Sequence, residues 1–160
     1  MTAETDRPRA APDAAGTALV FRAGPAYCAL PLGEVIETMR PLPVRPLAGT
    51  ADLVRGVCVM RGTAAPVIDV ARLLGGDEAD VSRFIAVRTD RGPIAFATGE
   101  VLGIRPVGGA AEAHRHPLGG APMRLVAGVC TFRGVPMLVW RDMSVLSGEI
   151  WAATALAGPS

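Results

Sequence analysis

Acidic and histidine side chains that could support catalysis are present in this sequence, but they are not arranged for it. Asp69 and Asp142 are each followed four residues later by a leucine, Leu73 and Leu146. An aspartate in this position is typical of a turn or helix start, where its carboxylate accepts a backbone hydrogen bond. A paired-carboxylate enzyme would need both acids in one pocket, and the sequence has no phosphate loop or Gly-x-Ser-x-Gly motif. We therefore predict no catalytic residue and no enzyme activity.

Metal binding has one candidate, the pair His114 and His116 in a glycine-rich stretch. Zinc sites in proteins use three or four protein ligands. The two histidines are accompanied by no Cys-x-x-Cys spacing and no acidic cluster. We interpret them as solvated loop residues and expect no metal and no cofactor.

The three cysteines, Cys28, Cys58 and Cys130, leave two alternatives open. Cys58 and Cys130 are flanked by Val or Thr, which is typical of reduced core residues in a strand. The other alternative is a redox pair, which needs two Cα atoms within about 7 Å. A thiol-based interaction module that responds to oxidation is therefore a second hypothesis for the function.

The opposite charges of Glu37 and Arg61 are the clearest candidates for recognition. If the stretch around Glu37 is extended, Val35 lies on the same face, because side chains in a strand alternate. Arg61 falls at a predicted hairpin tip, and Gly62 permits the tight turn. The two charges either form a surface bridge of little energetic value or serve to orient a partner.

Composition excludes several classes of protein. The 160 residues carry a net charge of +1, and their basic residues, all arginine, are interleaved with acids. Because no basic stripe forms, a nucleic-acid groove is not expected. No apolar run approaches the roughly 18 residues of a membrane span, so we expect a soluble protein with no membrane insertion. Residues 1–16 lack the pattern of an export signal, which predicts a cytoplasmic location. They also lack the apolar residues that would support an ordered structure, which predicts a disordered tail.

An internal repeat dominates the rest of the chain. Leu53–Gly62 and Leu125–Gly134 agree at seven of ten positions, and Gly33-Glu-Val35 recurs as Gly99-Glu-Val101. A repeat of this size indicates two copies of one structural unit. We place the first unit at about residues 17–76 and the second at about 77–147, leaving 148–160 as a C-terminal tail.

Each unit reads as about five short strands with glycine and proline turns. In the first unit, alternating apolar segments at 18–22, 26–30 and 54–60 predict strands, and 64–68 is the returning strand of a hairpin. Asp69 is expected to cap a short helical turn that stops at Gly75. Because little else is helical, the pattern predicts an all-β fold of two small barrels packed side by side, whose closure would remove exposed sheet edges.

Several short motifs recur in a fixed order along residues 17–147. They are Leu19-Val-Phe-Arg22, Leu30-Pro-Leu32 with Val35-Ile-Glu37, Gly56-Val57 with Arg61-Gly62, Pro66-Val-Ile-Asp69, Ile94-Ala95 before Val101, and Gly128-Val129 leading to Asp142. Together they resemble the CheW family of bacterial chemotaxis adaptors. The resemblance implies two tandem SH3-like five-stranded barrels and a non-catalytic scaffold that couples a chemoreceptor's cytoplasmic tip to the regulatory domain of a CheA-type histidine kinase.

The resemblance also implies a binding surface. Carried over from the family's motifs, the receptor-facing set is Val35, Glu37, Gly56, Arg61 and Val101. Gly62, Asp69 and Asp142 are interpreted as structural turn residues. Arg133, the repeat counterpart of Arg61, is interpreted as a soluble turn residue.

Overall fold

The computed structural model describes residues 16–107 and 125–154. The predicted N-terminal tail before Gly16, the pair His114 and His116, and the last residues of the predicted C-terminal tail lie outside these ranges. The strands are β1 Thr17–Ala23, β2 Ala26–Pro31, β3 Val35–Met39, β4 Val54–Met60, β5 Thr63–Asp69, β6 Arg83–Val87, β7 Ile94–Thr98, β8 Val101–Pro106, β9 Val126–Phe132 and β10 Val135–Trp140. The helices are η1 Leu32–Glu34, α2 Val70–Leu73 and α4 Met143–Thr154.

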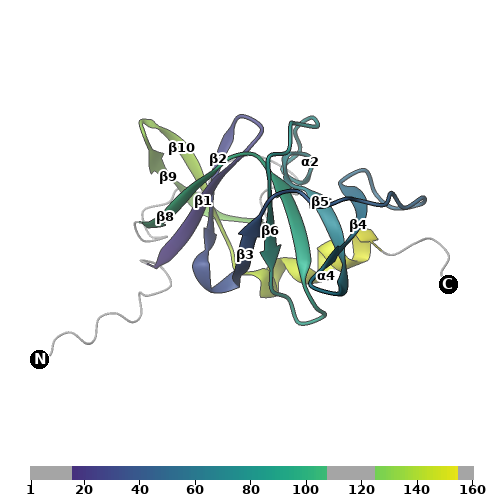
Figure 1. Ribbon diagram of the computed structural model, residues 1–160. Coiled ribbons are helices and arrows are strands. Elements are labelled where there is room, and N and C mark those ends of the chain that lie inside the picture. Colours follow the sequence, from purple (N-terminus) through teal and green to yellow (C-terminus); the bar gives the residue numbers. More distant parts are fainter. Residues whose placement is uncertain (1–15, 108–124, 155–160) are drawn as a thin grey trace, which may run out of the picture.

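The strands form two five-stranded sheets that lie side by side (Figure 1). Sheet A has the order β8-β1-β2-β10-β9, and sheet B has the order β3-β6-β7-β5-β4. In both sheets one pair is parallel, β10 with β2 and β5 with β7. The predicted all-β fold with two five-stranded units and short helices is confirmed.

The sheet order reveals how the two repeats are combined. If β1 to β5 are matched with β6 to β10, the two sheets have the same order, but each takes two strands from one repeat and three from the other. Two backbone hydrogen bonds reflect this exchange: Arg22 N donates to Glu100 O, and Arg88 N donates to Glu34 O, both at 2.9 Å. The predicted boundary near residue 76 thus separates the two repeats of the sequence and not the two sheets.

The predicted closure into barrels is wrong. Within the described residues, strand pairing ends at β8 and β9 in sheet A and at β3 and β4 in sheet B. In sheet B the segment that follows β3 pairs with β4 only through an isolated bridge between Arg45 and Val57. The physical reason lies in the prolines between them, Pro41, Pro43 and Pro46, which have no N–H group to donate to a continuous ladder.

Successive side chains of one strand point into different hydrophobic clusters, of which there are three among the described residues. On β1, Leu19 and Phe21 belong to a large shared cluster, whereas Val20 faces a smaller cluster within sheet A. On β7, Phe96 joins the shared cluster and Ala95 a small cluster within sheet B. Each sheet therefore encloses its own small core with one face and packs against the other sheet with the opposite face.

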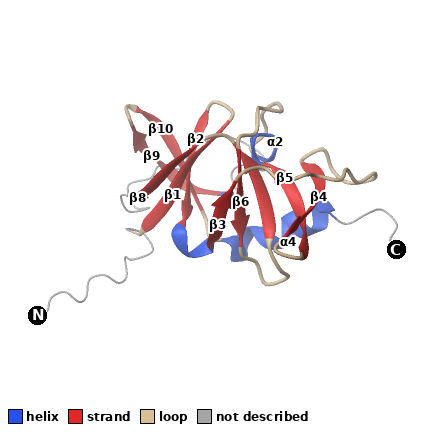
Figure 2. Cartoon of the chain, in the orientation of Figure 1, coloured by secondary structure: helices blue, strands red, loops and turns tan. Residues whose placement is uncertain are grey.

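The C-terminal segment is a helix and not the tail predicted from residue 148. Helix α4 runs from Met143 to Thr154, leaving sheet A and crossing to sheet B (Figure 2). Its Ile150 is buried in the shared cluster, and the indole N–H of Trp151 donates to Thr89 Oγ1 at 3.0 Å. The helix thereby ties the two sheets together. Its buried residues Met143 and Ile150 are held by tertiary contacts in the shared cluster, which the sequence alone does not report.

Candidate interaction site

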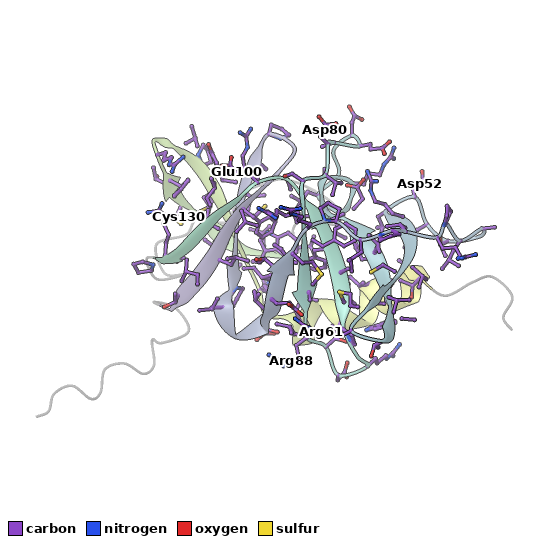
Figure 3. All side chains as sticks on the ribbon, in the orientation of Figure 1. Asp52, Arg61, Asp80, Arg88, Glu100 and Cys130 are labelled. Atoms are coloured by element: carbon purple, nitrogen blue, oxygen red, sulfur yellow. The ribbon has the colours of Figure 1, made fainter. Side chains whose placement is uncertain are left out.

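Arg61 occupies the tip of the hairpin between β4 and β5. Its backbone has a φ of 50°, and Gly62 follows with a φ of 83°. Two successive positive φ values are typical of the two-residue turns that match the twist of a hairpin. This conformation is uncommon for an arginine, and it projects the side chain outward, with 78% of its surface exposed. Figure 3 shows Arg61 at the end of sheet B opposite Asp80.

Glu37 on β3 accepts two hydrogen bonds from Arg61. Arg61 Nε lies 2.6 Å from Glu37 Oε2, and Nη2 lies 2.8 Å from Oε1. These hydrogen bonds, together with the positive charge, lower the pKa of Glu37 from its ordinary value of 4.5. The same carboxylate raises the pKa of Arg61. Because β3 and β4 are the two edges of sheet B, the pair spans the opening of the sheet.

Two other residues of the predicted receptor-facing set lie in different sheets. Val35 on β3 and Val101 on β8 are partly buried against the shared core cluster. They occupy equivalent positions in the two sheets, one at the start of each edge strand. The structure thus brings Glu37 and Arg61 into contact but sets Val35 and Val101 in different sheets.

Gly56 is buried in β4 beneath the segment that carries Arg45. Its φ is 144°, and a Cβ atom added there would lie 2.8 Å from Arg45 C and 2.9 Å from the Cα of Pro46. The absence of a side chain allows Arg45 and Val57 to exchange backbone hydrogen bonds of 2.9 Å. Gly56 therefore has a backbone role: it lets the segment that carries Arg45 lie against β4.

Two exposed apolar side chains accompany the ion pair and were missed in the sequence. Ile36 precedes Glu37 on β3 and is 43% exposed, and Val59 on β4 is 63% exposed. Ile36 lies where the register between β3 and β6 shifts, so the bulge displaces it from regular pairing. Val59 sits at the one exposed position of β4, a signal that strict alternation along 54–60 contains. Apolar groups beside oriented charges are typical of interaction surfaces.

Two of the predicted turn residues, Asp69 and Asp142, lie directly before helices. Asp69 is buried, and its Oδ1 accepts from the backbone N of Arg72, which confirms that it caps α2. Its Oδ2 lies 3.2 Å from Arg55 Nε, and Arg55 Nη2 also contacts Glu78 at 2.9 Å. Asp142 is exposed and directly precedes α4. The Asp69 carboxylate thus stabilises a helix start and an ion-pair network.

The structure places the three cysteines of the thiol alternative in three different hydrophobic clusters. Cys28 lies in the shared cluster, Cys58 in the core of sheet B, and Cys130 at the core of sheet A. Burial raises the pKa of Cys28 to about 12. Burial also raises the pKa of Cys58. Raised pKa values keep these two thiols protonated and slow to react at neutral pH.

Within residues 16–107 and 125–154, no group of three or more His, Cys, Asp or Glu side chains is placed to hold a metal ion. No helix in the same ranges combines the length and apolar character needed to cross a membrane.

The fold and the site together define a small two-sheet β-protein whose exposed ion pair is flanked by apolar side chains. The model of the CheW-like domain matches residues 17–148, so the chain belongs to the CheW-like domain family. The structure is similar to the scaffolding protein TtCheW from Thermoanaerobacter tengcongensis, with a TM-score of 0.68 and 17% identity, over 81% of this chain and 91% of that one. At this identity the likeness shows a shared fold. No curated protein matches the sequence.

Proposed function

We propose that this protein is a non-catalytic adaptor that couples chemoreceptors to a CheA-type histidine kinase in a chemosensory array. Membership of the CheW-like family and a fold shared with a scaffolding protein support this role. Both partners would act in the cytoplasm, where the signalling tip of a receptor and the regulatory domain of the kinase lie. Coupling requires that the two partners bind at the same time and at distinct surfaces.

The observation that carries the proposal is the oriented, exposed guanidinium of Arg61. A guanidinium has five N–H donors, and Glu37 uses two of them. The remaining donors face solvent on a side chain that the ion pair holds in one orientation, so a partner would not have to order it. The exposed Ile36 and Val59 on the same two strands supply apolar area beside this charge.

Arg61→Ala is expected to weaken binding of a receptor-tip fragment about tenfold to a hundredfold, as is typical of an interface hot spot. The fold should remain, because Arg61 is exposed and contributes nothing to the core clusters. Titration calorimetry with the purified variant measures the loss, and a melting curve checks that the variant is folded.

Arg91→Ala is the matched control, since Arg91 is also an exposed arginine at a turn of sheet B. It should bind the receptor fragment as the wild type does. If a folded Arg61→Ala variant also binds with unchanged affinity, Arg61 and Glu37 form only a surface bridge, and the receptor surface lies elsewhere.

A further inference from the structure

The two halves of the molecule differ at the position of the ion pair. Arg133 and Gly134 form the β9–β10 turn with φ values of 54° and 82°, which match Arg61 and Gly62. The counterpart of Glu37 is Gly103, because each residue follows a register shift at the start of its edge strand. Sheet A therefore keeps the arginine of the pair but lacks the carboxylate.

The backbone explains why an internal acid does not fill this position. Gly103 has a φ of 113°, a conformation that residues with side chains rarely adopt. Among the described residues, no carboxylate forms a salt bridge with Arg133 or Arg105. Within the described part of the chain, the half of the molecule built around sheet A thus presents arginines that form no salt bridge with a neighbouring acid.

These arginines converge on one aromatic ring. The guanidinium carbon of Arg133 lies 5.0 Å from the ring centre of Phe132, and that of Arg105 lies 5.5 Å from the same centre. Tyr27 packs edge-on against Phe132 at 5.1 Å, and Arg22 lies over Tyr27 at 5.4 Å. Two guanidiniums held near one ring raise the local positive potential, so an anion close to this ring would be stabilised by both.

A groove adjoins this cluster at the open edge of sheet A. It has a volume of about 600 Å³ and runs between the end of β8 and the β9–β10 hairpin. Its lining mixes polar and apolar surface, and the apolar part includes Val129, Pro136 and Met137. Val135, at the start of β10, is 40% exposed. Figure 3 places Cys130, on the same hairpin, on the side of the molecule away from Arg61.

We infer that Arg105, Phe132 and Arg133, here called the arginine–aromatic surface, bind an acidic, extended segment of a partner protein. A carboxylate of that segment would accept hydrogen bonds from these guanidiniums, in the role that Glu37 plays toward Arg61. A neighbouring apolar side chain would enter the groove beside Met137. Charge complementarity and the mixed lining favour a peptide over a nucleic acid, because the apolar part of the groove offers a phosphate backbone little. The inference goes beyond the proposed function, because it assigns a second binding surface whose residues lie outside the predicted receptor-facing set.

The test uses the full chain and a fluorescein-labelled synthetic peptide in which glutamate alternates with valine. Fluorescence anisotropy should show saturable binding that weakens several-fold when salt rises from about 50 to about 200 mM, because exposed charges are screened. The double variant Arg105→Gln, Arg133→Gln should lose at least about tenfold in affinity. A peptide with glutamine in place of glutamate should bind at least about tenfold more weakly to the wild type.

Arg91→Gln is the matched control for loss of charge, and it should bind the acidic peptide as the wild type does. A melting curve confirms that each variant is folded. Absence of binding to the wild type, equal binding by the double variant, or equal binding of the glutamine peptide would overturn the inference. Tighter binding of an oligodeoxythymidine of the same net charge would also overturn it, because the surface would then recognise phosphate.

Discussion

The variant Gly56→Ala is expected to lose about 4 kcal/mol or more of unfolding free energy and to accumulate poorly as folded protein. The added methyl group would meet the backbone of Arg45 and Pro46 at distances that real Cβ atoms do not adopt, and the φ of 144° is itself unfavourable for alanine. Because both partners are backbone, no side-chain rotation relieves the contact, and effects of this size belong to strain at special backbone positions. Urea denaturation followed by circular dichroism measures the loss.

Gly33→Ala is the matched control. Gly33 is exposed next to β3, and an added Cβ would meet nothing within 4 Å. Its stability should change by less than about 1 kcal/mol. A Gly56→Ala protein that is as stable as the wild type but no longer binds a receptor fragment would contradict the structural account, because it would assign Gly56 a direct contact.

Trp140→Ala is expected to cost about 3–5 kcal/mol of unfolding free energy, the usual range for removing a large buried aromatic side chain. Trp140 is 1% exposed and joins the sheets, with its ring centre 6.0 Å from Phe21 of sheet A and 5.7 Å from Phe96 of sheet B. Its loss would open a cavity in the cluster that the sheets share. Chemical denaturation of the purified variant gives the value.

Trp140→Phe serves as the comparison for this prediction. Phenylalanine keeps an aromatic ring between Phe21 and Phe96, so its cost should be clearly smaller than that of alanine. If the two variants lose the same stability, or if neither loses any, packing around Trp140 does not hold the sheets together.

The strands of this protein could be predicted from the sequence because the signals are local. The alternation along 54–60 and the Arg61-Gly62 turn were confirmed, as were the cap at Asp69 and the left-handed stop at Gly75. Pairing between distant strands was not predictable in the same way. A repeat tells which segments are equivalent, but not whether β3 pairs with a strand of its own copy or of the other, and here it pairs with β6.

The candidate site shows the same limit. Opposite charges at Glu37 and Arg61 could be noticed in the sequence, but their contact depends on how near the two edges of sheet B approach each other. The role of Gly56 depends on Arg45, eleven positions earlier along the chain, and no local pattern reports that approach. The arginines around Phe132 could be interpreted only once the structure showed that Gly103 occupies, in sheet A, the position that Glu37 occupies in sheet B.

The most direct test of the adaptor role is whether one molecule binds both partners at once. Analytical ultracentrifugation of the wild-type chain with a receptor-tip fragment and a CheA-type regulatory domain measures this, at concentrations above the micromolar Kd values expected for reversible interfaces of moderate size. We expect a ternary complex whose mass is the sum of the three components. Mutually exclusive binding of the two fragments, or binding of neither, would contradict it.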